Sequence, residues 1–259
     1  MIPLFELEDA GAGSPGSVLL HPTTLKIAEG ETTVFLGPSG SGKSTLLKLL
    51  AGLISPTQGE VRYRGKDLAT MNSRELSAFR LATAFVFQNS ALWQNLTLRQ
   101  NLALPLNWNF PKMEHAEVER RIQFALDQVG YHEALTTRPG EQSIGEQIAL
   151  GVARAIALDP PIYFLDSPLS ELDSATAHKV VSAILNLKKK GRTLLLVTSA
   201  LDFALQVADN LCLFNFGRVE FVGTTSEGVA QWPDFLDEIK ESHRSLLAAR
   251  GMVASGGRE

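Results

Sequence analysis

A glycine-rich segment containing one lysine and several hydroxyl residues has the composition of a phosphate-binding loop. The segment GPSGSGKST, residues 37–45, fits the pattern G-x-x-x-x-G-K-[ST]. In such a loop successive backbone N–H groups point at a phosphate, and the N-terminus of the following helix adds partial positive charge. The lysine would neutralise the β and γ phosphates, and the Ser44 hydroxyl would bind Mg²⁺. The residues predicted to bind a nucleotide here are Gly37, Pro38, Ser39, Gly40, Ser41, Gly42, Lys43, Ser44 and Thr45.

A carboxylate that could share this metal ion ends an apolar run further along the chain. Asp166 follows IYFL, residues 162–165. Side chains at the carboxyl end of a parallel strand face the crevice in which such sheets bind ligands. Taken alone, an aspartate at this position would as readily cap a helix. Together with the glycine loop, it is predicted to be the metal carboxylate.

The first part of the chain, which must position the glycine loop, is predicted to be rich in strands. Alternating apolar and polar residues predict strands at 4–8, 24–27 and 61–64, whereas 11–17 has the composition of a loop. The apolar run 33–36 leads into the glycine loop, and the leucines of STLLKLLAGL that follow it have helical spacing.

Helices dominate the middle of the chain. A helical pattern from about 97 to 158 includes apolar residues at 118, 122, 126 and 129 and predicts a helical subdomain. A helix at about 174–190 lies between apolar runs at 162–165 and 194–197, which predicts a parallel βαβ unit. The last predicted element is a hairpin formed by 211–214 and 219–222.

Composition excludes several classes of protein. The chain has 259 residues, a net charge of −4 and one cysteine, Cys212. A disulfide framework and a cysteine-based zinc cluster are therefore excluded, and the acidic balance argues against binding to nucleic acid. No apolar run is long enough to cross a bilayer, and the first residues do not have the pattern of a signal peptide. We expect an intracellular, soluble domain with a sizeable core.

The order of the motifs resembles that of the ATP-binding cassette (ABC) family over about residues 4–225. The resemblance rests on GPSGSGKST, VFQ at 86–88, ARAIALDPPIYFLD at 153–166 and SPLSELD at 167–173. It implies an α/β P-loop NTPase cassette with a mixed sheet, an antiparallel β subdomain and an inserted helical subdomain. We expect the nucleotide-binding domain at 2–235, its helical subdomain at about 92–158, and a C-terminal tail at 236–259.

The resemblance also implies cofactors and an assembly. ATP and Mg²⁺ would be bound, with Gln88 reaching the metal, so that Ser44, Gln88 and Asp166 are the expected metal ligands. Two cassettes would pair head to tail, each ATP lying between one glycine loop and the signature loop of the other chain. Where the family signature is similar to LSGGQ, this chain has QSIGE at 142–146. Ser143 and Gly145 are expected to contact the partner's ATP, while Ile144 and Glu146 depart from the pattern and weaken that contact.

Both groups that complete hydrolysis in the family are replaced. Ser167 occupies the position of the catalytic glutamate, and Ser199 that of the switch histidine. A serine hydroxyl does not accept a proton near neutral pH. Glu171 is a conceivable substitute, but it lies in the stretch that resembles the loop facing the partner. Residues 9–20 also lack the aromatic side chain on which family members usually stack adenine.

One segment indicates a transporter type. Residues 80–106 are similar to the ATPases of MCE-type lipid transport systems, as is the stretch 232–239. In the family this region faces a membrane permease, so Leu92, Trp93 and Leu96 are docking candidates, with a role in the subdomain core as the equal alternative.

Two hypotheses follow. In the first, the chain binds Mg-ATP, hydrolyses it poorly and pairs with a catalytically competent nucleotide-binding subunit to drive a permease, with MCE-type substrate-binding proteins as further partners. It would lie in the cytoplasm, peripheral on the inner face of the cell membrane. In the second, the chain is a non-hydrolytic structural or regulatory module that dimerises on ATP. A tandem cassette acting on ribosomes is disfavoured, because only one glycine loop is present and the chain is acidic.

Overall fold

A computed structural model describes residues 2–14, 16–232, 234–235, 237–239 and 241. The chain divides into two compact units, which we describe separately. The first comprises the described residues of 1–27, 32–65 and 197–259, and the second comprises 28–31 and 66–196. Most of the tail predicted at 236–259 lies outside the described residues, and the boundaries 2–235 and about 92–158 stay predictions.

An antiparallel sheet forms one layer of the first unit. Its central strand β1 (Phe5–Ser14) pairs with β2 (Ser17–Ile27) on one side and with β4 (Gln58–Tyr63) on the other. Phe5 lies opposite both Ile27 and Tyr63, and its side chain is fully buried. The predicted strands in this part of the chain are confirmed.

The prediction of a loop at 11–17 is wrong, because β1 and β2 continue through almost all of it as a hairpin with register shifts. Small residues, which suggested a loop, instead permit close approach of the two strands. A Cβ on Gly13 would lie 2.6 Å from the carbonyl oxygen of Ser17. Only glycine fits that spacing.

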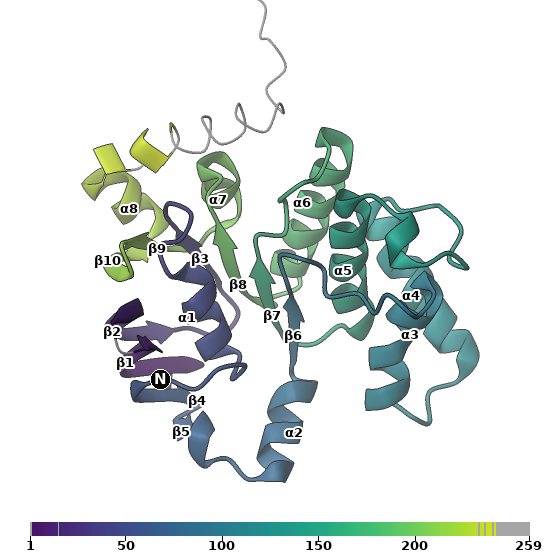
Figure 1. The fold of residues 1–259 in the computed structure, drawn as a ribbon, viewed down its shortest axis with the longest axis horizontal. Coiled ribbons are helices and arrows are strands. Elements are labelled where there is room, and N and C mark those ends of the chain that lie inside the picture. The colour runs from purple at the N-terminus through teal and green to yellow at the C-terminus, as the bar shows by residue number, and fades with distance from the viewer. Residues whose placement is uncertain (1, 15, 233, 236, 240, 242–259) are drawn as a thin grey trace, which may run out of the picture. The chain divides into compact units, whose positions relative to one another are not determined.

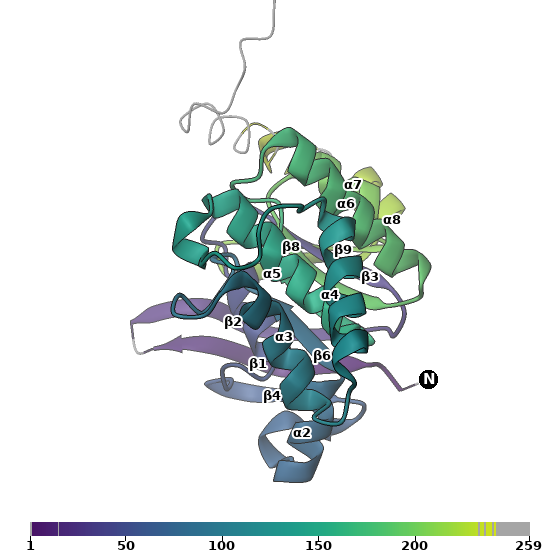
Figure 2. The same ribbon diagram turned by 90° about the vertical axis from the view of Figure 1, so that its right-hand side faces the viewer.

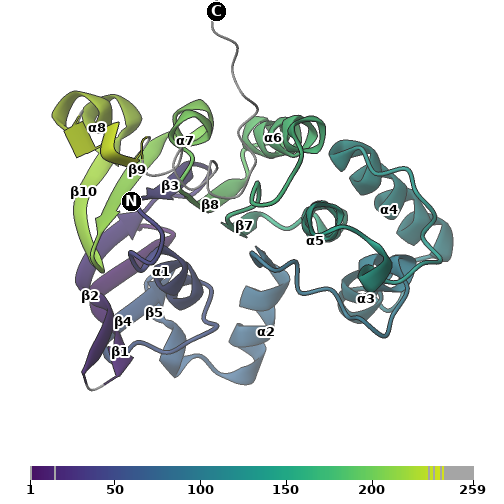
Figure 3. The ribbon, with the colours of Figure 1, turned by 45° about the horizontal axis from the view of Figure 1, so that its top comes forward.

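The second layer of the first unit carries the glycine loop. β3 (Thr32–Leu36) is buried at every residue and pairs in parallel with β9 (Asn210–Asn215), which pairs antiparallel with β10 (Arg218–Thr224). The sheet is therefore mixed, and the predicted closing hairpin is confirmed. α1 (Lys43–Leu50) contacts β2 of the antiparallel layer (Figure 1 and Figure 3). The remaining helices of this unit are α7 (Leu201–Val207) and α8 (Thr225–Gln231).

The second unit contains a βαβ arrangement. β6 (Thr83–Val86) pairs in parallel with β7 (Ile162–Asp166), whose other neighbour is β8 (Thr193–Thr198). α6 (Ser174–Lys189) connects β7 to β8, as predicted. The Asp173 side chain caps its N-terminus, and Lys188 and Lys189 lie in its last turn, where they oppose the helix dipole.

The helical subdomain of the second unit has α5 (Ile144–Leu158) at its centre, and α3 (Leu98–Asn109) and α4 (His115–Val129) both pack against it (Figure 2). The apolar face of α4 is buried, as its spacing predicts, and Gly130 ends the helix with a positive φ of 69°. A helical subdomain in this part of the chain is thus confirmed. The remaining elements of this unit are β5 (Lys66–Asp67), a 3₁₀ turn at Leu68–Thr70, α2 (Ser73–Leu81) and a 3₁₀ turn at Pro139–Glu141.

Candidate functional site

The glycine loop of the first unit joins β3 to α1, and its backbone packs so closely on β9 and β2 that side chains are excluded at two of its glycines. A Cβ on Gly37 would lie 2.3 Å from the carbonyl oxygen of Phe214, and one on Gly42 would lie 2.5 Å from that of Leu19. Gly42 also has φ 95° and begins α1 with no side-chain cap. The N–H groups of the first turn therefore keep their capacity to bind an anion.

A buried lysine supplies positive charge inside this loop. Lys43 is 6% exposed, and its ammonium group donates to the carbonyl oxygen of Gly37 at 2.9 Å, to that of Pro38, and to the Ser41 hydroxyl at 3.1 Å. Each of these acceptors belongs to the loop itself. A nucleotide phosphate fits this place, because a buried ammonium group forms strong charge-assisted hydrogen bonds to anionic oxygens.

The rest of the loop is open to a ligand. Ser39 and Gly40 are exposed at the tip, and Ser44 and Thr45 are half-buried on the first turn of α1. The glycines, the lysine and the hydroxyl groups together have the chemistry of a polyphosphate site. The ligand contacts assigned to residues 37–45 stay predictions.

In the second unit, Asp166 is the last residue of β7 and is 4% exposed. Ser167 follows it with a positive φ of 53° and accepts hydrogen bonds at its carbonyl oxygen from the N–H and the hydroxyl of Ser170. A non-glycine residue in this conformation costs about 1 kcal/mol or more, which the surrounding bonds offset. The carboxylate thus lies at a strand end, as expected, and a hydroxyl follows it.

Gln88 is exposed in the segment after β6, where a neighbouring arginine holds the backbone in place. Ser90 and Ala91 have positive φ values of 60° and 47°, and the Arg154 guanidinium on α5 donates to both of their carbonyl oxygens at 2.9 Å. Burial lowers the pKa of Arg154 from its usual value. The arginine therefore couples the segment after Gln88 to the helical subdomain.

The residues at the signature position form the start of α5. Ser143 is the N-cap, and its N–H and hydroxyl donate to the Glu146 carboxylate at 2.8 and 2.7 Å. Ile144 is 63% exposed. Gly145 lies against the segment of Glu171, since a Cβ there would be 2.7 Å from the Glu171 carbonyl oxygen. The serine hydroxyl expected to meet a phosphate therefore already donates to a carboxylate of its own helix.

Ser199 directly follows β8 and is half-buried, as is Glu171. The predicted residues divide between the units: the loop 37–45 and Ser199 belong to the first, and Gln88, Ser143, Gly145, Asp166 and Ser167 to the second. Across the described ranges, no three His, Cys, Asp or Glu side chains gather into a metal site. Mg²⁺ here would take several of its ligands from nucleotide phosphates and water, as it commonly does in proteins.

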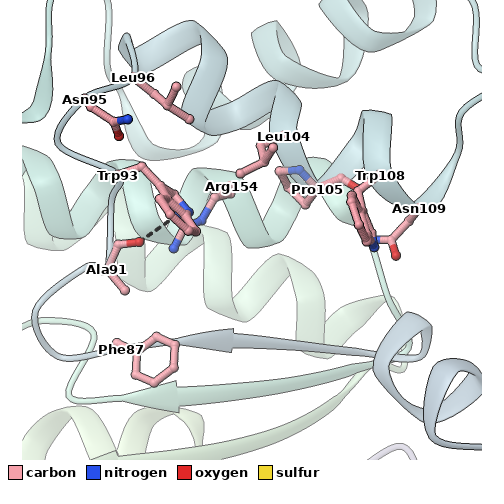
Figure 4. Close-up of a pocket in the computed structure, with 10 residues that line it drawn as sticks. All are labelled: Phe87, Ala91, Trp93, Asn95, Leu96, Leu104, Pro105, Trp108, Asn109 and Arg154. Atoms are coloured by element: carbon pink, nitrogen blue, oxygen red, sulfur yellow. Dashed lines mark hydrogen bonds between the residues drawn. The ribbon is translucent and has the colours of Figure 1, made fainter. Parts of the chain in front are cut away.

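The second unit has an apolar groove of about 860 Å³, and only some of the residues that line it were predicted from the sequence. Trp93 lines it and is 59% exposed, as expected for a docking residue, and Leu96 lines it half-buried. Leu92 is 7% exposed and belongs to the core, so for this residue the alternative of a core role holds and docking does not. Trp108, 83% exposed, was missed, although its helical spacing from Leu104 was visible. Figure 4 shows the side chains that line the groove, which are those of Phe87, Ala91, Trp93, Asn95, Leu96, Leu104, Pro105, Trp108, Asn109 and Arg154.

No helix within the described ranges has the length and apolar character needed to span a membrane.

Comparison with known proteins places these features in a family. A profile of the ABC transporter family matches residues 20–170. An uncharacterized ABC transporter ATP-binding protein of Methanocaldococcus jannaschii is 38% identical over 189 residues, which is 73% of this chain and 84% of that protein. The macrolide export ATP-binding/permease protein MacB of Marinobacter nauticus is 35% identical over 207 residues, covering 78% of this chain and 32% of MacB.

A solved structure agrees with these matches. It is an ATP-binding cassette solved as a dimer in a post-hydrolysis state, bound to ADP and Pi. It is 30% identical, with a TM-score of 0.77, and the match covers 85% of this chain and 98% of that one. The fold is thus the P-loop NTPase fold of an ABC cassette, as predicted. The chain belongs to the ABC transporter family, as an ATP-binding subunit.

Proposed function

We propose that this subunit binds Mg-ATP through its glycine loop with impaired hydrolysis at its own site, and that it acts beside a second nucleotide-binding subunit to drive a permease. The observation that carries the proposal is an intact phosphate loop in a chain with serine at both hydrolytic positions, Ser167 and Ser199. Gly37–Thr45 would hold the phosphates, and Ser44, Gln88 and Asp166 would hold the metal. When bound, Mg²⁺ would neutralise phosphate charge.

Impaired hydrolysis follows from the chemistry of the serine side chain. A hydroxyl at position 167 can donate to or accept from a water molecule, but it does not take a proton from that water near neutral pH. Loss of a positioned general base typically costs about 10²–10⁴ in rate, or about 3–5 kcal/mol of barrier. A competent partner subunit would supply the missing turnover, and Ser143 and Gly145 would face that partner's ATP.

The groove of the second unit supports docking of a permease. Two exposed tryptophans and Leu104 form an apolar surface, and such patches mark interaction sites. MacB joins an ATP-binding part and a permease in one protein, by its name. The subunit would then lie at the inner face of the cell membrane. The similarity of residues 80–106 to MCE-type ATPases favours lipid as cargo and MCE-type substrate-binding proteins as partners.

Equilibrium binding of Mg-ATP to the purified chain tests the nucleotide site. Lys43→Ala removes the buried ammonium group and should weaken binding at least tenfold, because its charge-assisted bonds to phosphate are lost. Lys48→Ala, in the last turn of the same helix, is the matched control and should bind as the wild type does. Equal affinities for the wild type and Lys43→Ala would contradict the proposal.

Purification of the tagged chain from its native membrane tests the assembly. A polypeptide with transmembrane segments and a second nucleotide-binding subunit should accompany it. Combined Trp93→Ala and Trp108→Ala should lose the permease, whereas Phe124→Ala, which removes an aromatic ring 43% exposed on α4, should retain it. A chain recovered only with copies of itself, closed on ATP, would instead favour the non-hydrolytic dimerisation module.

A further inference from the structure

The turn between β9 and β10 carries an aromatic side chain that its backbone does not favour. Phe216 and Gly217 are the central residues of this two-residue turn, with φ values of 43° and 75°. Two positive φ values in succession are best met by Asn, Asp or Gly, and a bulky residue is strained at the first position. Phe216 is nevertheless 85% exposed, so burial in the core does not explain it.

This turn packs directly on the glycine loop, within the first unit. The Gly217 N–H donates to the carbonyl oxygen of Ser41 at 3.1 Å, and its own carbonyl oxygen accepts from the His21 N–H at 2.8 Å. A Cβ on Gly42 would lie 3.4 Å from the Cα of Gly217. Phe216 is therefore covalently adjacent to a residue that touches the predicted phosphate site.

An exposed aliphatic side chain, that of Leu19 on β2, lies on a segment next to this turn. Leu19 is 53% exposed, and a Cβ on Gly42 or on Gly217 would lie 2.5 or 3.2 Å from its carbonyl oxygen. Leu19 on β2 and Phe216 in the β9–β10 turn thus both belong to segments that meet at the start of α1. Residues 9–20 of the β1–β2 hairpin contain no aromatic residue.

We propose that Phe216, with Leu19 beside it, is the platform on which the base of the bound nucleotide stacks. The inference rests on the proposed function, because it takes the phosphates to lie in the glycine loop. A purine base has a flat π face that stacks on an aromatic ring, and an aliphatic side chain packs against its edge. This function explains why an aromatic residue occupies a strained, solvent-exposed turn next to a phosphate loop.

Phe216→Asn separates this role from a structural one. Asparagine suits positive φ, so the free energy of unfolding should stay equal or rise. The affinity for Mg-ATP should nevertheless fall about tenfold, which corresponds to about 1.4 kcal/mol and lies within the range of base stacking on an aromatic ring. Affinity for Mg-tripolyphosphate, which has no base, should not change. Phe216→Trp should bind ATP as tightly as the wild type, and Val222→Ala, which trims an exposed side chain on β10, is the control.

Four outcomes overturn one claim or the other. If ATP binding depends on Lys43 but is the same in the wild type and Phe216→Asn, the platform is refuted and the nucleotide site stands. If Phe216→Asn weakens ATP and tripolyphosphate equally, the turn acts on the phosphates and the platform is again refuted. If Lys43→Ala changes nothing, the proposed function itself fails. Loss of a protein partner from Phe216→Asn, with unchanged ATP affinity, would assign Phe216 to an interface instead.

Discussion

At the scale of single residues, the N-terminus of α5 is capped by the side chains of Ser143 and Glu146. The Glu146 carboxylate accepts from the N–H and the hydroxyl of Ser143, and the Glu146 N–H donates back to that hydroxyl at 3.2 Å. This capping box stabilises the helix. It also places a negative charge where the resemblance expects the γ-phosphate of a partner's ATP, and like charges repel. A phosphate approaching Ser143 must therefore compete with Glu146.

Glu146→Gln should strengthen ATP-dependent association with the second nucleotide-binding subunit roughly threefold or more, because glutamine keeps the capping box without its charge. Sedimentation with and without Mg-ATP measures the effect, and the melting temperature should change little. Glu141→Gln is the control, since Glu141 caps a neighbouring 3₁₀ turn through the Arg138 N–H. Unchanged or weaker association of Glu146→Gln would show that the carboxylate does not oppose the phosphate.

At the scale of elements, a buried asparagine on α3 holds the segment that carries Trp93. Asn101 is 1% exposed, and its side-chain oxygen accepts from the Trp93 N–H at 2.7 Å. Its amide nitrogen donates to the carbonyl oxygens of Trp93 and Thr97 at 3.0 Å each. These bonds fasten the Trp93 backbone to α3, although the carbonyl oxygens of Trp93 and Thr97 also accept from the N–H groups of Leu96 and Asn101. Asn101 therefore helps to hold the groove wall in place.

Asn101→Leu should lower the free energy of unfolding by about 2 kcal/mol, because the Trp93 N–H loses the acceptor that Asn101 provides. Denaturant titration measures it. Asn107→Leu, at an exposed position of the same helix, should cost less than about 0.5 kcal/mol. The account of the groove wall would be wrong if the two variants had equal stability.

The elements and the phosphate loop could be predicted from the sequence because local periodicity and a spaced motif encode them. The helix face of α4 and the buried strand before the loop are examples. The strand at residues 11–14 could not be predicted, because a segment rich in glycine and alanine has the composition of a loop. Its small residues are required by the close approach of the partner strand at 17–20, which the local sequence does not reveal. Burial of Leu92 and exposure of Trp108 depend on packing between helices distant in sequence, which no local pattern specifies.

At the scale of the whole molecule, nucleotide binding and stability are linked, because a ligand that binds only the folded state raises the free energy of unfolding. The glycine loop joins a strand that is fully buried to a helix whose leucines form part of the core. Binding of a nucleotide to the loop should therefore raise the free energy of unfolding of the chain.

Mg-ATP at about 100 times its dissociation constant should add about 2.7 kcal/mol to the stability of the wild type and raise its melting temperature by about 5–10 °C. Lys43→Ala should show little shift at the same concentration, because the occupancy of its site is reduced. Differential scanning calorimetry of both proteins, each with and without nucleotide, makes the comparison. Equal shifts would place the nucleotide elsewhere.

The most direct test of the central claim measures ATP binding and ATP turnover in the same preparation of the isolated chain. We predict Lys43-dependent binding of Mg-ATP with turnover no higher than that of Lys43→Ala, since Ser167 and Ser199 replace the hydrolytic groups. Turnover at the rate usual for ABC ATPases, abolished by Lys43→Ala, would contradict it.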